Sequence, residues 1–118
     1  YATWLAEKHG LRAVLINPAV AAALDFTTQI GTLTHYHSGA PFDFTATHVA
    51  EINALTVPVI TRPERYWVLL ETGDEVLDYR DAAAKYATVR QSVFPGGNHA
   101  FTRWGEVLDE VFAFATAQ

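Results

Sequence analysis

Hydrophobic residues along this chain follow two kinds of pattern, short continuous runs and longer stretches with helical spacing. The short runs end at asparagine, glycine or proline, which is typical of strands that lead into loops. They predict strands at residues 13–16, 67–71 and 90–94. Hydrophobic residues three and four positions apart predict helices at residues 1–9, 45–55, 79–87 and 101–117, with a shorter helical piece at 20–24.

Helices and strands alternate along most of the chain, which favours an α/β fold with a mainly parallel sheet, flanking helices and right-handed crossovers. Gly10, Thr47 and Asp78 stand where the caps of the predicted helices are expected.

The alternation is interrupted at residues 25–44, where threonine, glycine, histidine and aromatic residues follow no sustained period. Residues 56–63 are broken by prolines, which predicts an edge or connecting segment rather than a central strand. We therefore expect a lid-like segment over about residues 25–65, within a single domain that includes all of residues 1–118.

Composition narrows the classes of function. With 118 residues, half of them hydrophobic, the chain is one domain or part of one. Eight basic against 13 acidic residues give a net charge of −5, which argues against nucleic-acid and membrane partners, because both bind basic surfaces. No apolar run approaches the length of a membrane span, and the lack of cysteine excludes disulfides and thiolate chemistry. We expect a cytoplasmic protein.

An acid and a histidine each follow the carboxyl end of a predicted strand. Asp74 comes after the strand at 67–71, and His99 comes after the strand at 90–94. This edge of an open parallel sheet is where ligands bind, and neighbouring loops can bring the two side chains within hydrogen-bonding distance. A carboxylate that orients a histidine base is part of a Ser-His-Asp triad. Asp74 is preferred to Asp78 because it directly follows the strand, whereas Asp78 precedes a helix.

Three further residues lie at the same predicted edge. Asn17 follows the first strand, where its amide can line a substrate pocket or bond to its own turn. Val76 is a second candidate substrate contact. Glu75, between Asp74 and apolar residues, is expected to be solvated.

Four segments carry a family resemblance when they are taken together and in order. They are Tyr1-Ala-Thr-Trp-Leu5, Ile16-Asn-Pro-Ala-Val20, Thr72-Gly-Asp-Glu-Val-Leu-Asp-Tyr-Arg80 and Gly96-Gly-Asn-His-Ala-Phe-Thr102. Together they resemble the YqiA-like esterases of the α/β-hydrolase superfamily. The resemblance touches both ends of the chain and is weak across about residues 25–65. It implies that Asp74 is the triad acid and His99 the triad base, with no cofactor.

The same resemblance implies a Gly-x-Ser-x-Gly nucleophile elbow immediately before Tyr1. The chain contains no such motif, and neither Ser38 nor Ser92 fits a strand-to-helix elbow. We therefore expect the C-terminal part of an α/β-hydrolase domain, cut just after its nucleophile and inactive alone. The parent would be a serine esterase or thioesterase that acts on small-molecule acyl esters or thioesters. Two alternatives stay open, a non-catalytic α/β-hydrolase-like binding module and a hydrolase with an aspartate nucleophile.

A cluster of histidines raises the alternative of a metal site. His35 and His37 are one residue apart, and Asp43 and His48 lie nearby in sequence. No third ligand has convincing spacing for zinc, which requires three or four protein ligands. We expect no metal here.

In an α/β-hydrolase the strand at 13–16 pairs with the nucleophile strand, which this chain does not contain. One apolar edge would then be uncovered, and uncovered edges pair with other chains. We expect the isolated 118 residues to self-associate.

Overall fold

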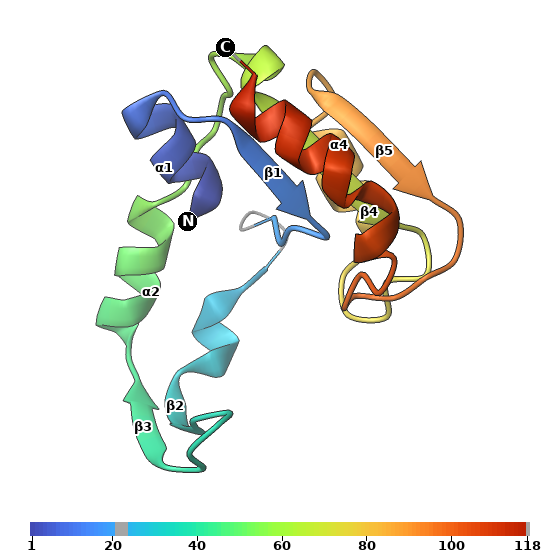
Figure 1. Ribbon diagram of the computed structural model, residues 1–118. Helices are drawn as coiled ribbons and strands as arrows, with labels where there is room; N and C mark the ends of the chain where they lie inside the picture. The colour runs from blue at the N-terminus through green and yellow to red at the C-terminus, as the bar shows by residue number, and fades with distance from the viewer. Residues whose placement is uncertain (21–23, 118) are drawn as a thin grey trace. The chain divides into compact units, whose positions relative to one another are not determined.

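The computed structural model describes residues 1–20 and 24–117 and divides into two compact units, Tyr1–Val20 with Val57–Gln118, and Ala21–Thr56. The first contains α1 (Ala2–His9), β1 (Ala13–Ile16), η3 (Pro63–Arg65), β4 (Tyr66–Glu71), α3 (Tyr79–Lys85), β5 (Arg90–Phe94) and α4 (Trp104–Thr116) (Figure 1). The second contains η2 (Phe26–Gln29), β2 (Gly31–Thr34), β3 (Pro41–Phe44) and α2 (Ala46–Ala54). Of the short helical piece predicted at 20–24, residues 21–23 lie outside the described residues.

The first unit is built on a three-stranded parallel sheet in the order β1-β4-β5. The central strand is β4, which pairs with β1 from Ala13 opposite Tyr66 and with β5 up to Phe94 opposite Glu71. Each strand is followed by a crossover before the next parallel strand, as this arrangement requires. The predicted α/β class, with a mainly parallel sheet and flanking helices, is confirmed.

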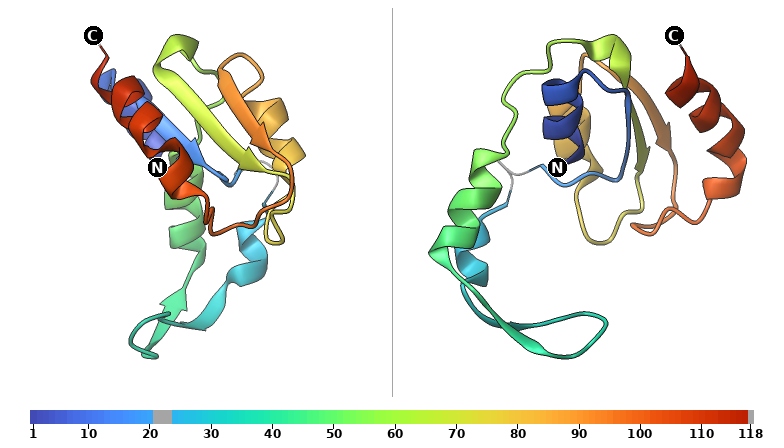
Figure 2. Two further views of the ribbon diagram at one scale, coloured as in Figure 1. Left: turned by 45° about the vertical axis from the view of Figure 1, so that its right-hand side comes forward. Right: turned by 60° about the vertical axis from the view of Figure 1, so that its left-hand side comes forward.

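Alternate residues of β4 point to opposite faces of the sheet and build two hydrophobic cores. Figure 2 shows α1 and α3 on one face of the sheet and α4 on the other. The first core contains Ala6, Leu15, Tyr66, Val68, Leu70, Ala82, Tyr86 and Val89. The second, beside α4, contains Trp67, Leu69, Phe101 and Val107. Because both faces are covered, β4 is hydrophobic at every position except the last, and all six residues are buried.

The ends of the helices agree with two of the predicted caps. Gly10 ends α1 in the left-handed conformation with a φ of 64°, and Asp78 caps α3 by accepting a hydrogen bond from the backbone N–H of Arg80. The closing helix begins at Trp104 rather than at residue 101, because Phe101 has a φ of 55°, outside the right-handed helical region. Residues 56–63 contain no strand and connect the two units in sequence.

The second unit contains a β-hairpin that the sequence pattern did not predict. Its strands, β2 and β3, pair in antiparallel fashion, with Gly31 opposite Phe44. Each strand has four residues, and only Leu33, Phe42 and Phe44 are half-buried. An alternation this short and this exposed is too weak to distinguish a strand from a loop.

The cap of α2 is a correction to the prediction. Thr45, not Thr47, is the N-cap residue, and its side chain accepts a hydrogen bond from the backbone N–H of His48. The ring of His48 in turn accepts the backbone N–H of Thr45 at 3.0 Å. Histidine stands where this reciprocal arrangement usually has Glu or Gln, so the sequence pattern does not predict a cap at Thr45.

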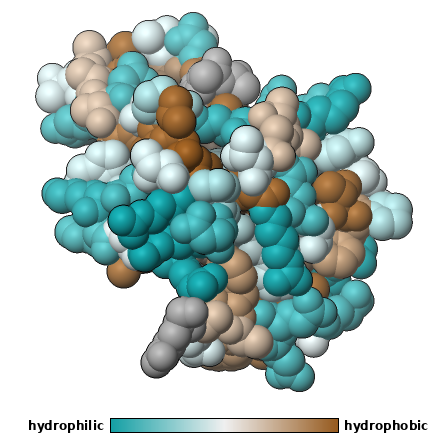
Figure 3. Space-filling view, turned by 90° about the horizontal axis from the view of Figure 1, so that it is seen from above, coloured by the Kyte–Doolittle hydropathy of each residue, from teal (hydrophilic) through white to brown (hydrophobic). Residues whose placement is uncertain are grey.

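Large hydrophobic side chains remain exposed on several elements. They include Tyr1, Leu5, Leu11, Ile16, Val93, Trp104 and Phe112. On the face shown in Figure 3, hydrophobic residues are scattered among hydrophilic ones, a distribution that marks no binding site by itself. Every helix within the described residues is too short or too polar to cross a membrane.

Within the described residues β1 is an edge strand, because it pairs with β4 on one side only. Its four residues are hydrophobic, and an open hydrophobic edge leaves backbone N–H and C=O groups for another chain to pair with. We expect the isolated 118-residue chain to self-associate. Size-exclusion chromatography with light scattering over a dilution series measures this, and a monomer mass that is independent of concentration would contradict it.

Candidate active site

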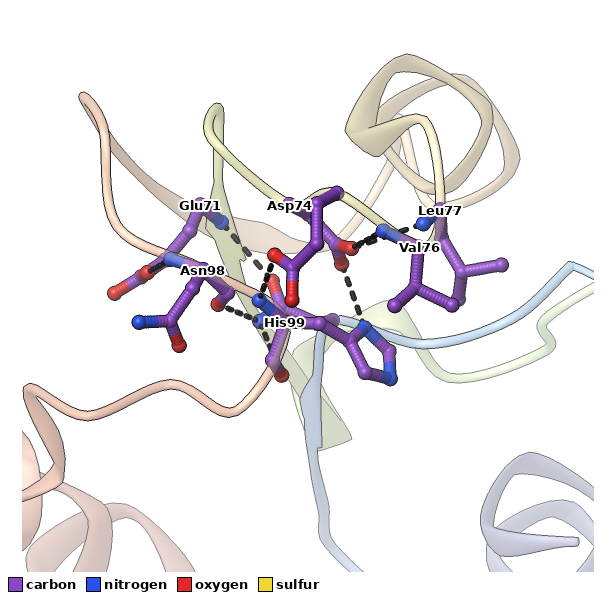
Figure 4. A network of polar contacts seen from close by, with 8 residues as sticks. Glu71, Asp74, Val76, Leu77, Asn98 and His99 are labelled. Carbon is purple, nitrogen blue, oxygen red and sulfur yellow. Dashed lines mark hydrogen bonds and ion pairs between the residues drawn. The ribbon is translucent and has the colours of Figure 1, made fainter.

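The loops that follow β1, β4 and β5 lie at one edge of the sheet, because the three strands are parallel. The backbone N–H of Thr72 donates to the carbonyl of Phe94 at 3.0 Å, and that of Gly73 donates to the carbonyl of Gly96 at 2.8 Å. Pairing between these two strands therefore continues into their loops. Figure 4 shows the result, in which polar side chains of the two loops face one another.

Asp74 and His99 are in direct contact. Asp74 Oδ2 lies 2.8 Å from His99 Nδ1 (Figure 4). The other carboxylate oxygen, Oδ1, accepts the backbone N–H groups of Val76 and Leu77 at 2.9 Å each. The Asp74 side chain is 2% exposed and the His99 side chain 39% exposed. The contact predicted from the two loops is present, with the acid fixed in place and the imidazole accessible on its other side.

The surroundings of Asp74 favour its charged form. Burial acts to raise the pKa of this carboxyl, but the hydrogen bonds with His99 and with the backbone of Leu77 and Val76 outweigh burial and hold its pKa below the usual value. A carboxylate only accepts hydrogen bonds, so His99 Nδ1 is the donor. In the neutral ring Nε2 then carries the lone pair and can accept a proton.

Asp78 has other partners. Its carboxylate lies 2.6 Å from Arg80 Nη2 and also caps α3. The hydrogen bond with the Arg80 side chain lowers the pKa of Asp78 to about 2. The geometry therefore favours Asp74 over Asp78 as the partner of His99.

The ring nitrogen Nε2 of His99 lies on the side away from Asp74 (Figure 4). A hollow of about 380 Å³ is lined by residues 72 and 74–80, which include Asp74 but not His99. Val76 is in this lining and is 63% exposed. Its role as a substrate contact stays a prediction.

Asn17 is 5% exposed and has a φ of 41°. Its amide nitrogen donates to the carbonyls of Asn98 and His99 at 3.1 Å each, and its amide oxygen accepts the backbone N–H of Glu71 at 3.0 Å. Both polar atoms are thus used inside the protein. These partners lie in β4 and in the His99 loop rather than in the turn of Asn17 itself, so Asn17 ties the ends of β1 and β4 to the His99 loop. Its role as a substrate contact stays a prediction.

Glu75 is exposed, as the sequence predicts, and it also contacts the His99 loop. Its Oε2 accepts the backbone N–H of His99 at 3.0 Å. The acid loop therefore holds His99 twice, through the ring by Asp74 and through the backbone by Glu75.

Two glycines allow the loops to approach this closely. A Cβ at Gly73 would lie 2.6 Å from the carbonyl oxygen of Gly97, and a Cβ at Gly97 would overlap the carboxylate of Glu71. Gly97 also has a φ of 75°, which favours glycine. A side chain at either position would displace the loop that carries His99.

Sequence reasoning missed Glu71 and Arg103. Glu71 ends β4 and is fully buried, and its carboxylate contacts Arg103 Nε at 2.5 Å and the backbone N–H of Asn98. A glutamate at the end of an otherwise apolar strand is a usable signal, because buried charges are rare unless paired. Arg103 carries no such signal in the sequence.

The two serines lie in other settings. Ser92 is within β5, and its hydroxyl accepts the indole N–H of Trp67 at 3.0 Å. Ser38 lies in the turn between β2 and β3, where its hydroxyl accepts the backbone N–H of Ala40 at 3.2 Å. Neither serine stands between a strand and a following helix, as a nucleophile elbow requires.

The histidines weighed as metal ligands have aromatic neighbours. The ring of His35 packs on Phe42 with centroids 4.6 Å apart, and the ring of His48 stacks on Phe44 at 5.5 Å. In the part of the chain that the structure describes, no three His, Asp or Glu side chains form a group that could hold a metal ion.

Residues 1–116 match the family model UPF0227, which is described as an uncharacterised protein family. UPF0227 is the name under which the YqiA-like esterases are grouped, so the family indicated by the four segments is the family that matches. The description of this family assigns no activity.

Proposed function

We propose that this chain, which belongs to the UPF0227 family, is the acid–base part of a serine hydrolase that cleaves acyl esters or thioesters. The observation that carries the proposal is the 2.8 Å hydrogen bond between buried Asp74 and the partly exposed ring of His99. The resemblance to α/β-hydrolases supplies the rest, a serine in an elbow N-terminal to Tyr1. The chain without that serine is expected to be inert.

In this mechanism His99 is the general base and then the general acid. Nε2 takes the proton of the serine hydroxyl while the serine oxygen attacks the acyl carbonyl. Asp74 keeps Nδ1 protonated and stabilises the imidazolium that forms. Nε2 then gives its proton to the leaving alcohol or thiol, and the bond between the acyl carbon and that group breaks. A water molecule, activated by the same nitrogen, releases the acyl group from the serine.

The remaining parts of the mechanism are assigned by analogy with the fold. The oxyanion would be bound by backbone N–H groups after the serine and after the first strand of the domain, both outside this chain. The segment at about residues 25–65 is proposed as a lid, because it follows β1 in the chain, where α/β-hydrolases carry such segments.

The test uses the protein extended upstream through the elbow, with nitrophenyl esters and acyl thioesters of increasing chain length. We expect turnover of at least one substrate and covalent labelling of one serine by a fluorophosphonate, located by mass spectrometry. Turnover with incorporation of ¹⁸O into an aspartate, and no labelled serine, would instead identify an aspartate nucleophile. Binding without turnover would identify a non-catalytic module.

A further inference from the structure

The carboxylate of Glu71 is fully buried at the end of β4, next to the loop that carries His99. One oxygen, Oε1, lies 2.5 Å from Arg103 Nε, and the other, Oε2, accepts the backbone N–H of Asn98. Gly97 lies so close to this carboxylate that it has no room for a Cβ. Glu71 therefore contacts two consecutive residues that immediately precede His99.

Arg103 connects Glu71 to the start of α4. It is the residue before this helix, its side chain is 22% exposed, and its guanidinium also lies 3.5 Å from Glu106 and over the ring of Phe94. A guanidinium held on several sides is a rigid partner. The ion pair with Glu71 therefore joins the end of β4 to the end of the His99 loop, so that the loop is fixed at both sides.

Asn17, at the end of β1, also supports the backbone of the His99 loop. Its amide donates to the carbonyls of Asn98 and His99, while Glu71 accepts the N–H of Asn98. Both backbone polar groups of Asn98 are therefore bound by side chains from strand ends. Side chains at the ends of β1 and β4 therefore hold the backbone that carries the imidazole, independently of the contact between Asp74 and the ring.

We propose that Glu71, paired with Arg103, is a positioning residue that holds His99 in the orientation in which Nδ1 faces Asp74. The proposal rests on the proposed function for its catalytic consequence. Glu71 touches neither the ring nor a reacting atom, and it acts through the backbone of Asn98. Loss of this support lets the imidazole move, and a misplacement of about 1 Å can cost about 100-fold in rate.

The experiment compares Glu71→Gln, Arg103→Gln and the double variant in the protein extended upstream through the elbow. We expect kcat to fall by about 100-fold in Glu71→Gln, with KM little changed, because ground-state binding does not use this pair. The two residues act as one unit, so the double variant should lose no more than the worse single variant. In NMR spectra, the signal of the His99 Nδ1 proton should shift or broaden in each folded variant.

The matched control is Glu110→Gln, which breaks the exposed ion pair between Arg90 and Glu110 and removes the same charge. It should leave kcat and the His99 signal as in the wild type.

If Glu71→Gln does not fold, Arg103→Gln tests the proposal in its place, because the Arg103 side chain is less buried than that of Glu71. A lower melting temperature with an unchanged His99 signal and unchanged kcat would show that the pair only stabilises the fold and would overturn the proposal. The NMR comparison needs no substrate, so it still tests positioning by Glu71 if no ester is hydrolysed.

Discussion

Replacing His99 with alanine is expected to lower the turnover of the complete hydrolase by about 10⁶-fold, as loss of the histidine does in another triad enzyme. His99 Nε2 is the proton acceptor for the proposed serine. Asp74 cannot take over this role, because its side chain is 2% exposed and lies on the far side of the ring. The fold should survive, since His99 stands in a loop and its side chain is 39% exposed.

Steady-state hydrolysis of the best ester substrate measures this loss, and a circular dichroism melt shows whether the variant is folded. His9→Ala is the matched control, because His9 is an exposed histidine in the last turn of α1. Turnover in a folded His99→Ala variant within about tenfold of the wild type would exclude His99 as the base, since a general base contributes more than that.

Asp74→Asn should lower kcat by about 10⁴-fold, the size of this effect in another triad enzyme. An asparagine can donate its amide N–H to Nδ1, which makes Nδ1 the acceptor and moves the ring proton to Nε2. Nε2 then carries a proton and cannot accept one from the serine. The amide oxygen can still accept the N–H groups of Val76 and Leu77, so the loop should keep its structure. KM should therefore change little.

The control for this prediction is Asp78→Asn, which alters an exposed acid in the same loop that pairs with Arg80 instead of His99. If the kcat of Asp74→Asn is less than about tenfold below the kcat of Asp78→Asn, Asp74 does not set the tautomer of His99.

The lowered pKa of Asp74 adds a second readout. The folded pKa lies below the ordinary value of 3.8, so Asp74 stabilises the fold at pH above that value, and this contribution is lost as the pH falls through the folded pKa. Asp74→Asn lacks the contribution. The difference in unfolding free energy between the wild type and this variant should be larger at neutral pH than in strongly acidic solution.

Local patterns in the sequence are sufficient to predict the three strands of the parallel sheet, because hydrophobic periodicity is a property of a few consecutive residues. The caps at Gly10 and Asp78 are local in the same way. The contact between Asp74 and His99 is also accessible from sequence, since parallel strands place their loops at one edge. The hairpin of β2 and β3 cannot be predicted from local sequence patterns, because its strands are short and exposed.

The tertiary structure alone decided what supports His99. Glu71 and Arg103 are 32 positions apart in the chain, and Asn17 and His99 are 82 positions apart. Their contacts depend on the strand order β1-β4-β5 and on a register that brings the ends of these strands level. A hydrogen bond forms only when donor and acceptor approach within about 3 Å. Sequence spacing carries no information about that distance when the residues belong to different strands, because the packing of the whole sheet sets it.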